Sequence, residues 1–238
     1  GGVPFFPALN KMPAHDINLV ASWTANEYEI VFNSNEGNGS MNNIKGVYDQ
    51  NITLPDSLFT RVGYEFFGWG LTKDAEEYFE AGQIVKNLTA ESGARITLYA
   101  LWGGSPYDVL FDANGGDGVM SSQEHIYDEY LNLSKNTFTK VGYTFNGWNT
   151  KANGTGLTYR DEQEVKNLVN NGSVTLYAQW KVNKYTISFD SNGGSFVASL
   201  TQDYESVVAA PETPERTGYT FNGWLYNGQP YEFDRMPA

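Results

Sequence analysis

The feature that most constrains this chain is an internal repeat with a period of 76 to 79 residues. The heptad GYEFFGW at 63–69 returns as GYTFNGW at 142–148 and again at 218–224. An alternating Tyr-x-Ile/Val-x-Phe segment begins upstream at Tyr28, Tyr107 and Tyr185. A Leu-Tyr-Ala-x-Trp block ends two of the copies, at Trp102 and Trp180. Because a fixed period makes each copy one structural module, we expect several small units instead of one large domain.

The order of these motifs gives the domain boundaries. We predict the C-terminal part of a repeat at 1–23, complete repeats at 28–102 and 107–180, and the N-terminal part of a repeat at 185–238. The segment LVASW at 19–23 matches the closing block. These ends indicate a stretch cut from a longer array; alternatively, residues 1–23 donate a closing strand to residues 185–238 of another copy. Linkers of about four residues reach roughly 14 Å at most, so the array should be semi-rigid.

Alternation with a period of two predicts mostly strands within each repeat. The tracts NSNEGNG, DANGGDG and DSNGG follow the first strand and predict hairpin turns. A second strand is expected to hold Tyr48, Tyr127 and Tyr204. The GYTFNGW heptad is expected to form a regular strand with aromatic residues on both faces. Short helical turns are expected at 86–88 and 166–168, which makes the predicted class α+β and sheet-dominated.

The three ordered motifs resemble the Listeria–Bacteroides repeat, also called the internalin B-repeat, over nearly the whole chain. The resemblance implies a tandem array of small β-grasp-like modules. It also implies a secreted or wall-attached bacterial surface protein, commonly an adhesin or an internalin-like protein, located at the cell surface or cell wall. The first complete copy departs from the pattern with Glu65 and Phe67, where the other copies have Thr and Asn.

Composition excludes several classes of function. With 15 Lys and Arg against 28 Asp and Glu, the net charge of −13 opposes binding to nucleic acid. The chain has no Cys, which excludes thiol nucleophiles, disulfides and thiolate metal sites. It has no apolar run of 18 residues, and residues 1–16 lack a basic region followed by an apolar stretch. We therefore expect no membrane insertion of this segment and no export signal of its own.

The same search predicts no catalytic, cofactor-binding or metal-binding residue. His15 and His125 occupy non-equivalent positions, so neither forms a recurring base with a partner. The carboxylate pairs Glu76–Glu77 and Asp161–Glu162 lie in polar tracts, where solvated loops are expected instead of glycosidase chemistry.

Calcium is the alternative considered for one turn. Asp112, Asn114 and Asp117 offer oxygen ligands at nearly alternate positions, but the distal Glu and the spacing of an EF-hand loop are missing. A hairpin turn explains the same Asn and Gly residues, so no metal is predicted there.

Aromatic residues suggest where contacts with partners could form. All six Trp recur at motif positions, which favours a role in each module's core over a sugar-binding platform. Residues that differ between copies, namely Phe79, Tyr130 and Phe196, are better candidates for a binding surface.

The leading functional interpretation is a non-catalytic stalk or spacer with adhesion to host protein or glycan, and no cofactor. Its other partners would be neighbouring repeats and further domains of a parent protein. The alternative is a glycan- or protein-binding accessory module of a larger secreted enzyme.

Overall fold

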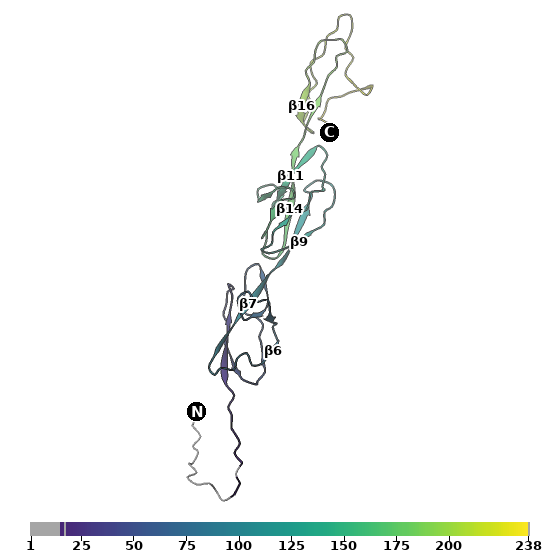
Figure 1. The fold of residues 1–238 in the computed structure, drawn as a ribbon. Coiled ribbons are helices and arrows are strands. Elements are labelled where there is room, and N and C mark those ends of the chain that lie inside the picture. Colours follow the sequence, from purple (N-terminus) through teal and green to yellow (C-terminus); the bar gives the residue numbers. More distant parts are fainter. Residues whose placement is uncertain (1–14, 17, 238) are drawn as a thin grey trace. The chain divides into compact units, whose positions relative to one another are not determined.

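The structure is a computed structural model that describes residues 15–16 and 18–237 (Figure 1). The first complete repeat contains the strands β1 (Glu27–Asn33), β2 (Ile44–Val47), β3 (Ile52–Thr53), β4 (Tyr64–Gly70), β5 (Tyr78–Phe79), β6 (Ile84–Val85) and β7 (Arg95–Gly104). The second contains β8 (Pro106–Asp112), β9 (Gln123–Ile126), β10 (Leu131–Asn132), β11 (Tyr143–Asn149), β12 (Thr158–Tyr159), β13 (Glu164–Val165) and β14 (Gly172–Val182). The third has β15 (Lys184–Ile187), β16 (Leu200–Asp203), β17 (Leu225–Tyr226) and β18 (Gln229–Pro230).

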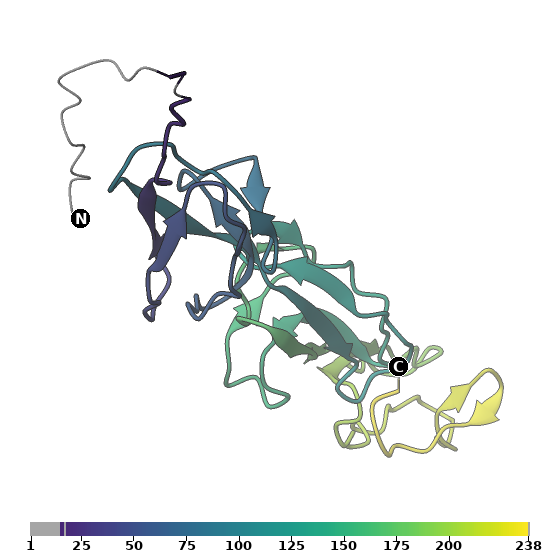
Figure 2. The same ribbon diagram turned by 90° about the horizontal axis from the view of Figure 1, so that it is seen from below.

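Each complete repeat forms one five-stranded sheet of the same order, β2-β1-β7-β4-β5 in the first and β9-β8-β14-β11-β12 in the second. The last long strand of each repeat lies in the middle of its sheet. It pairs in parallel with the first strand, as β7 with β1 and β14 with β8. Figure 2 shows the strands of the second repeat, coloured teal to green, side by side in this sheet. A parallel pair requires a long crossover connection, and the intervening strands and loops provide it.

The core of each complete repeat follows from the period-two pattern of its strands. In the second repeat, Tyr107 and Val109 of β8 and Leu176 and Ala178 of β14 are buried together with Trp148 of β11. Their first-repeat counterparts are also buried: Tyr28, Ile30, Leu98, Ala100 and Trp69. The motif residues that define the repeat are therefore mainly the residues that fill its core.

The GYTFNGW heptad at 142–148 does not form the regular strand that was expected, because a β-bulge interrupts it. Pairing between β11 and β14 shifts between Phe145 and Trp148, where Gly147 adopts a φ of 106° that side-chain-bearing residues rarely take. The extra residue turns Trp148 toward the face of Phe145, and the two rings lie 4.9 Å apart. The aromatic residues therefore share one face instead of dividing between two.

The predicted α+β class is wrong, because the described residues contain no helix. The expected helical turns at 86–88 and 166–168 do not form. Asn87 and Asn167 have φ angles of 55° and 56°, in the left-handed region that ends a right-handed helix. A sheet-dominated fold with repeated modules is what the structure supports.

The described residues of the third repeat, 185–237, form the two-stranded sheets β15-β16 and β17-β18 and no larger sheet. Its heptad at 218–224 contributes no strand, and Trp224 is half-buried where Trp69 and Trp148 are fully buried.

Two compact units divide the chain. Among described residues, the first comprises those up to Phe59 together with Phe67–Leu101. The second comprises Thr60–Phe66 and the residues from Trp102 onward. In the described part of the chain, no helix is long and apolar enough to cross a membrane.

Candidate functional site at the repeat junctions

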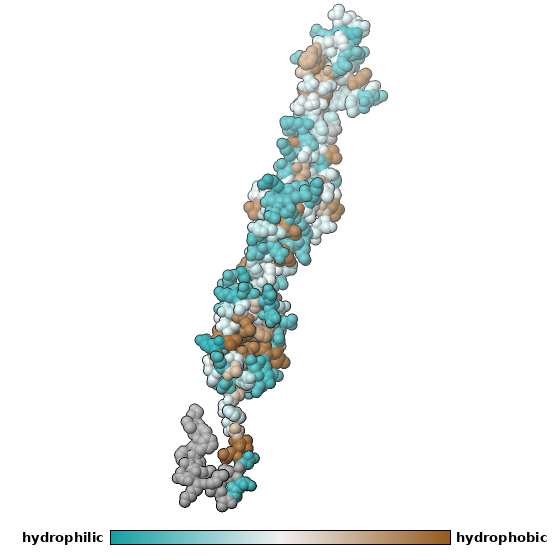
Figure 3. Space-filling view, in the orientation of Figure 1, coloured by the Kyte–Doolittle hydropathy of each residue, from teal (hydrophilic) through white to brown (hydrophobic). Residues whose placement is uncertain are grey.

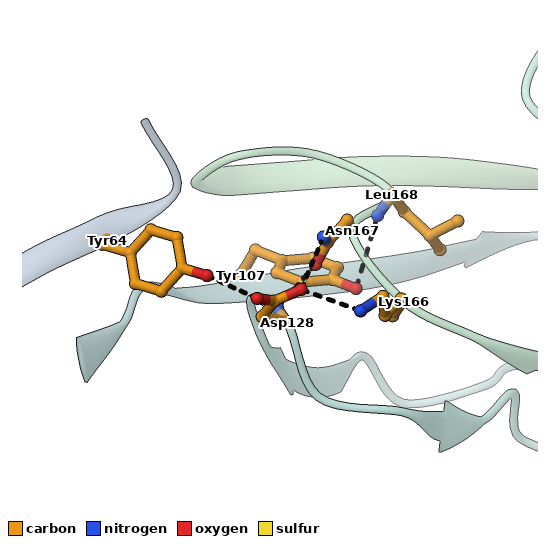
Figure 4. Close-up of polar contacts among 6 residues, drawn as sticks. All are labelled: Tyr64, Tyr107, Asp128, Lys166, Asn167 and Leu168. Atoms are coloured by element: carbon orange, nitrogen blue, oxygen red, sulfur yellow. Dashed lines mark hydrogen bonds and ion pairs between the residues drawn. The ribbon is translucent and has the colours of Figure 1, made fainter. Parts of the chain in front are cut away.

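The most elaborate polar cluster lies in the second unit, around the turn that follows β9. Asp128 has a φ of 70°, and its backbone N–H donates to Oδ1 of Asn167 at 2.6 Å. The Asp128 carboxylate accepts hydrogen bonds from Lys166 Nζ at 2.8 Å, from Asn167 Nδ2 at 3.3 Å and from the Tyr64 hydroxyl. Figure 4 shows these groups pointing at the same carboxylate. One side chain thus joins three segments of the second unit.

Electrostatics match this geometry. Hydrogen bonds from Lys166, then Tyr64 and Asn167, lower the pKa of Asp128 to about 2. The contact with Asp128 raises the pKa of Lys166 and also that of Tyr64. These shifts stabilise an ionised Asp128, a protonated Lys166 and a neutral Tyr64, which are the forms that make the hydrogen bonds of the cluster.

Packing of a tyrosine on a glycine accompanies the polar cluster. The Tyr127 ring occupies the space where a Cβ on Gly63 would lie, and it meets the Tyr64 ring edge to face at 5.4 Å. The backbone of Ser105 connects Gly63 to Tyr127. The Ser105 N–H donates to the Gly63 carbonyl at 2.9 Å, and the Ser105 carbonyl accepts from the Tyr127 N–H at 3.0 Å.

The same arrangement recurs between the second and third repeats. The Tyr204 ring covers Gly142 and meets Tyr143 edge to face at 6.0 Å. Asn183 donates its N–H to the Gly142 carbonyl and accepts from the Tyr204 N–H, both at 2.9 Å. We call each set a junction clasp: Gly63, Tyr64, Ser105 and Tyr127 form the first, and Gly142, Tyr143, Asn183 and Tyr204 the second. A cluster that recurs at the same repeat position is suited to fixing one segment against the next.

The turn considered for calcium is held by its own residues. Asp112 accepts a hydrogen bond from the Asn114 N–H at 2.7 Å, and the Asn114 side-chain amide donates to the carbonyls of Ala152 and Ala178. Asp117 exchanges backbone hydrogen bonds with Thr139. Among the described residues, no group of three or more His, Cys, Asp or Glu could hold a metal ion.

The carboxylate pairs have ordinary surroundings. Glu76 and Glu77 are exposed in the loop between β4 and β5. Asp161 accepts a hydrogen bond from the Asn136 N–H at 2.8 Å, while Glu162 occupies a turn with a φ of 54°.

The two histidines are not brought together. His15 is exposed, whereas His125 is 1% exposed and stacks on the Tyr107 ring at 5.3 Å. Among the residues that the structure describes, neither ring nitrogen of His125 has a hydrogen-bond partner, and burial lowers the pKa of His125.

The tryptophans fall into three groups. Trp69 and Trp148 are fully buried, as a core role requires. Trp102, Trp180 and Trp224 are half-buried, whereas Trp23 is 89% exposed.

Two of the three variable aromatic residues are accessible. Tyr130 is 64% and Phe196 is 89% exposed. Phe79 is half-buried in β5, opposite Trp69 of β4.

Sequence reasoning missed the roles of Gly63, Asp128, Lys166 and Asn167. A signal was present, because an acidic residue follows the turn tyrosine in every copy, as Tyr48-Asp49, Tyr127-Asp128 and Tyr204-Glu205. In the structure each of these tyrosines lies one residue beyond its strand, within the turn.

The model of the Listeria-Bacteroides repeat domain family matches residues 28–101, 107–179 and 185–237. The chain belongs to this family. The resemblance drawn from the three motifs is thereby confirmed.

Similarity to individual family proteins covers most of the chain. It is 32% identical over 216 residues to a protein named as a Gly-rich membrane protein of Evansella cellulosilytica, which covers 89% of this chain and 24% of that protein. It is 36% identical over 179 residues to Internalin H of Listeria monocytogenes, which covers 71% of this chain and 30% of that protein. The chain thus spans less than a third of the length of these relatives.

Proposed function

We propose that this chain is a non-catalytic spacer region of a bacterial protein that acts outside the cell, at its surface or wall. Its role would be to hold other domains of a larger protein at a fixed separation, with host protein or glycan as contacts. Support comes from membership of a family that includes an internalin and a protein named as a membrane protein. No cofactor is part of the proposal.

The observation that carries the proposal is the recurrence of the junction clasp. A spacer needs stiffness between modules, and a flexible linker would not supply it. In the second clasp, Asn183 bonds to backbone groups on both sides of the linker, and Tyr204 fills the space above Gly142. Ordered contacts at the linker restrict rotation about it.

Distance measurement across the second clasp tests the spacer role. The chain has no Cys, so spin labels can be attached at Asn153→Cys and Glu212→Cys, two exposed positions in the second and third repeats. We expect a narrow distance distribution that broadens when Tyr204→Ala removes the ring from the clasp. Tyr130→Ala is the matched control, because it removes an exposed tyrosine outside the clasps and should leave the distribution narrow. A broad distribution in the unsubstituted chain would contradict the spacer role.

Adhesion is supported separately by the exposed aromatic side chains of Tyr130 and Phe196, since exposed aromatic residues are common contact residues at interfaces. Binding of the chain to immobilised glycans and host surface proteins, compared with the Tyr130→Ala/Phe196→Ala variant, tests this role. Binding that the double substitution leaves unchanged would exclude these two residues as the contact site.

A further inference from the structure

The first repeat carries two exposed aromatic side chains that contact each other across strands. Phe67 of β4 and Tyr78 of β5 are 45% and 44% exposed, and their rings meet edge to face at 5.1 Å. The strand β5 is the edge of its sheet, and Tyr78 pairs there with Gly70 of β4. The next residue, Leu71, is 55% exposed. Figure 3 shows hydrophobic side chains gathered on the surface of the first repeat, with hydrophilic ones around them.

The second repeat has polar residues at the same two positions. The shared heptad and the pairing of β12 with β11 identify the counterparts of Phe67 and Tyr78 as Asn146 and Thr158, both of which are exposed. Of the described residues 149–158, one large apolar side chain is exposed, that of Leu157. Because these positions lie outside the core in both repeats, the two rings are not needed to fill a core. Exposed apolar groups that adjoin one another are typical of an interaction surface.

Charge around the two rings also differs between the repeats. Residues 67–80 contain four acidic residues against one Lys, a net charge of −3, and the corresponding residues 146–160 contain one Lys and one Arg and no acid, a net charge of +2. All four carboxylates are exposed, and none forms an ion pair among the described residues. They belong to Asp74, Glu76, Glu77 and Glu80. The negative charge beside the rings is therefore not neutralised within the described part of the first unit.

In the second unit, four tyrosine rings carry a cation of the chain itself. A Lys or Arg side chain lies 4.0 to 4.9 Å from each ring centroid, in the pairs Arg61–Tyr64, Lys140–Tyr143, Lys166–Tyr130 and Arg216–Tyr219. No Lys or Arg of the described residues lies over Phe67 or Tyr78 in this way. Because the face of an aromatic ring attracts a cation, these two rings and the carboxylates next to them favour a positively charged partner.

We propose that Phe67, Tyr78 and the carboxylates of residues 74–80 form a docking surface for a cationic, apolar segment of a partner protein. We call this surface the acidic-aromatic patch. A large apolar side chain of the segment would pack on the two rings, and its Lys or Arg side chains would lie over the ring faces and beside Glu76 and Glu77. Exposed ion pairs contribute little individually, so charge would select the partner while the apolar contact supplies most of the affinity.

The acidic-aromatic patch belongs to a complete repeat, within residues 67–80. The inference does not rest on the spacer role, which depends on the junction clasps. It also differs from adhesion through Tyr130 and Phe196, because neither of these residues is part of the patch.

Fluorescence anisotropy of labelled synthetic peptides with the full-length chain tests both parts of this chemistry. The probe is the amidated peptide KFKLFK, which combines Lys with large apolar residues. The peptide SFSLFS keeps the apolar residues without the charge, and KSKSSK keeps the charge without the apolar residues. We expect KFKLFK to bind about tenfold or more tightly than either of the other two. Equal affinities for KFKLFK and KSKSSK would overturn the proposal, because the contact would then depend on charge alone.

Substitution of the two rings locates the binding surface. Phe67→Asn/Tyr78→Thr gives the first repeat the residues of the second repeat, so the fold should tolerate the change. This variant should bind KFKLFK about tenfold more weakly. The matched control is Tyr130→Thr/Phe196→Asn, which removes an exposed Tyr and an exposed Phe outside the patch and should leave the affinity unchanged. Equal losses in the two double variants would mean that the patch is not the docking surface.

Substitution of two carboxylates tests the charge without touching the rings. Glu76→Gln/Glu77→Gln keeps the size of two exposed side chains and removes two negative charges, so folding should be unaffected. Binding of KFKLFK should weaken about fivefold. Glu212→Gln/Glu215→Gln removes the same charge from exposed positions in the third repeat and should have less effect. Equal losses would assign the attraction to the net charge of −13 and refute a local surface.

A comparison with neutral glycans separates the proposed partner from a sugar. The full-length chain and Phe67→Asn/Tyr78→Thr are applied to an array of uncharged glycans. We expect no glycan signal that depends on the two rings. Glycan binding that is lost in this variant, while its affinity for KFKLFK stays the same, would show that the rings bind sugar and would contradict the proposal.

Discussion

Two equivalent core tryptophans differ in one hydrogen bond. Trp69 Nε1 donates to the Pro55 carbonyl at 2.9 Å, whereas Trp148 Nε1 is buried and has no hydrogen-bond partner in the described part of the chain. Both rings are fully buried and meet a phenylalanine at similar distances, 4.7 Å for Phe32 and 4.9 Å for Phe111. The pair isolates the contribution of a buried indole N–H, because the remaining ring packing is alike.

Substituting each tryptophan by phenylalanine should therefore give unequal losses of stability. Both changes remove the same volume, but Trp69→Phe leaves the Pro55 carbonyl without its partner, while Trp148→Phe removes an unpaired donor. We expect Trp69→Phe to cost about 1–3 kcal/mol more than Trp148→Phe in the free energy of unfolding. Denaturant titration of both variants measures the difference. Equal losses would contradict this account.

His125 should make the second repeat sensitive to mild acid. Burial lowers its pKa, so the unfolded chain binds a proton at a higher pH than the folded chain does. Above pH ~6.5 the imidazole is neutral in both states and adds no pH dependence. As the pH falls below that value, only the unfolded state gains the proton, and stability should fall by up to about 1.4 kcal/mol per pH unit until the folded pKa is reached.

Thermal unfolding between pH 7 and pH 5 measures this effect. His125→Gln should flatten the pH dependence, since Gln does not titrate and Gln202 occupies the equivalent position. The matched control is the same substitution at the exposed second histidine, His15→Gln. If the pH dependence of thermal unfolding stays the same in His125→Gln, another group causes the acid sensitivity.

At the scale of elements, short loops with left-handed asparagines take the place of the expected helical turns. Asn87 and Asn167 each use the side-chain oxygen to accept a backbone N–H at 2.6 Å, from Asp49 and Asp128 respectively. In each complete repeat, this hydrogen bond ties the loop after β6 or β13 to the turn after β2 or β9. The asparagine conformation is thereby selected by a residue 38 or 39 positions away.

Asn167→Ala should destabilise the second repeat by about 1–3 kcal/mol. The substitution removes the partner of the Asp128 N–H and leaves a side-chain-bearing residue at positive φ with no compensating bond. Asn170→Ala, an exposed position in the same loop, should cost less than about 0.5 kcal/mol. Denaturant unfolding compares the two, and similar losses would show that the hydrogen bond to Asp128 contributes little.

Sequence reasoning predicted the elements whose cause is local and missed those whose cause is distant. The alternation of Tyr28, Ile30 and Phe32 is enough to indicate a strand with one buried face, and the structure has β1 there. The tripeptides at 86–88 and 166–168 fit a helical turn or a loop equally well by propensity. Their outcome depends on Asp49 and Asp128 across the repeat, which no local pattern encodes. The bulge at Gly147 was missed because the heptad taken alone satisfies a regular strand.

At the scale of the whole molecule, the junction clasps should couple the stability of one repeat to the stability of the next. In a repeat protein, each module adds its own stability and an interface term with its neighbours. The second clasp provides such a term, since Tyr204 of the third repeat packs on Gly142 of the second. A change confined to this contact should weaken coupling without altering either core.

Gly142→Ala is that change. A Cβ at Gly142 would overlap the Tyr204 ring, so we expect the second and third repeats to unfold in separate transitions. Gly172→Ala is a matched control: the φ angles are 77° and 73°, but a Cβ at Gly172 meets nothing within 4 Å. The control should lose about 1–2 kcal/mol from left-handed strain and keep its coupling. Calorimetry distinguishes the outcomes, and a single unchanged transition in Gly142→Ala would show that the clasp does not couple the repeats.

The place of β14 in its sheet determines when its repeat can fold during translation. This strand is the last in its repeat, yet it forms the middle of the sheet and separates β8 from β11. While the ribosome is still making residues 107–171, the nascent chain can form the β8–β9 hairpin but cannot join the two halves of the sheet. Each complete repeat should therefore stay unfolded through most of its translation and close in one step when its final strand emerges. A chain that must pass through a narrow export channel would benefit from that delay.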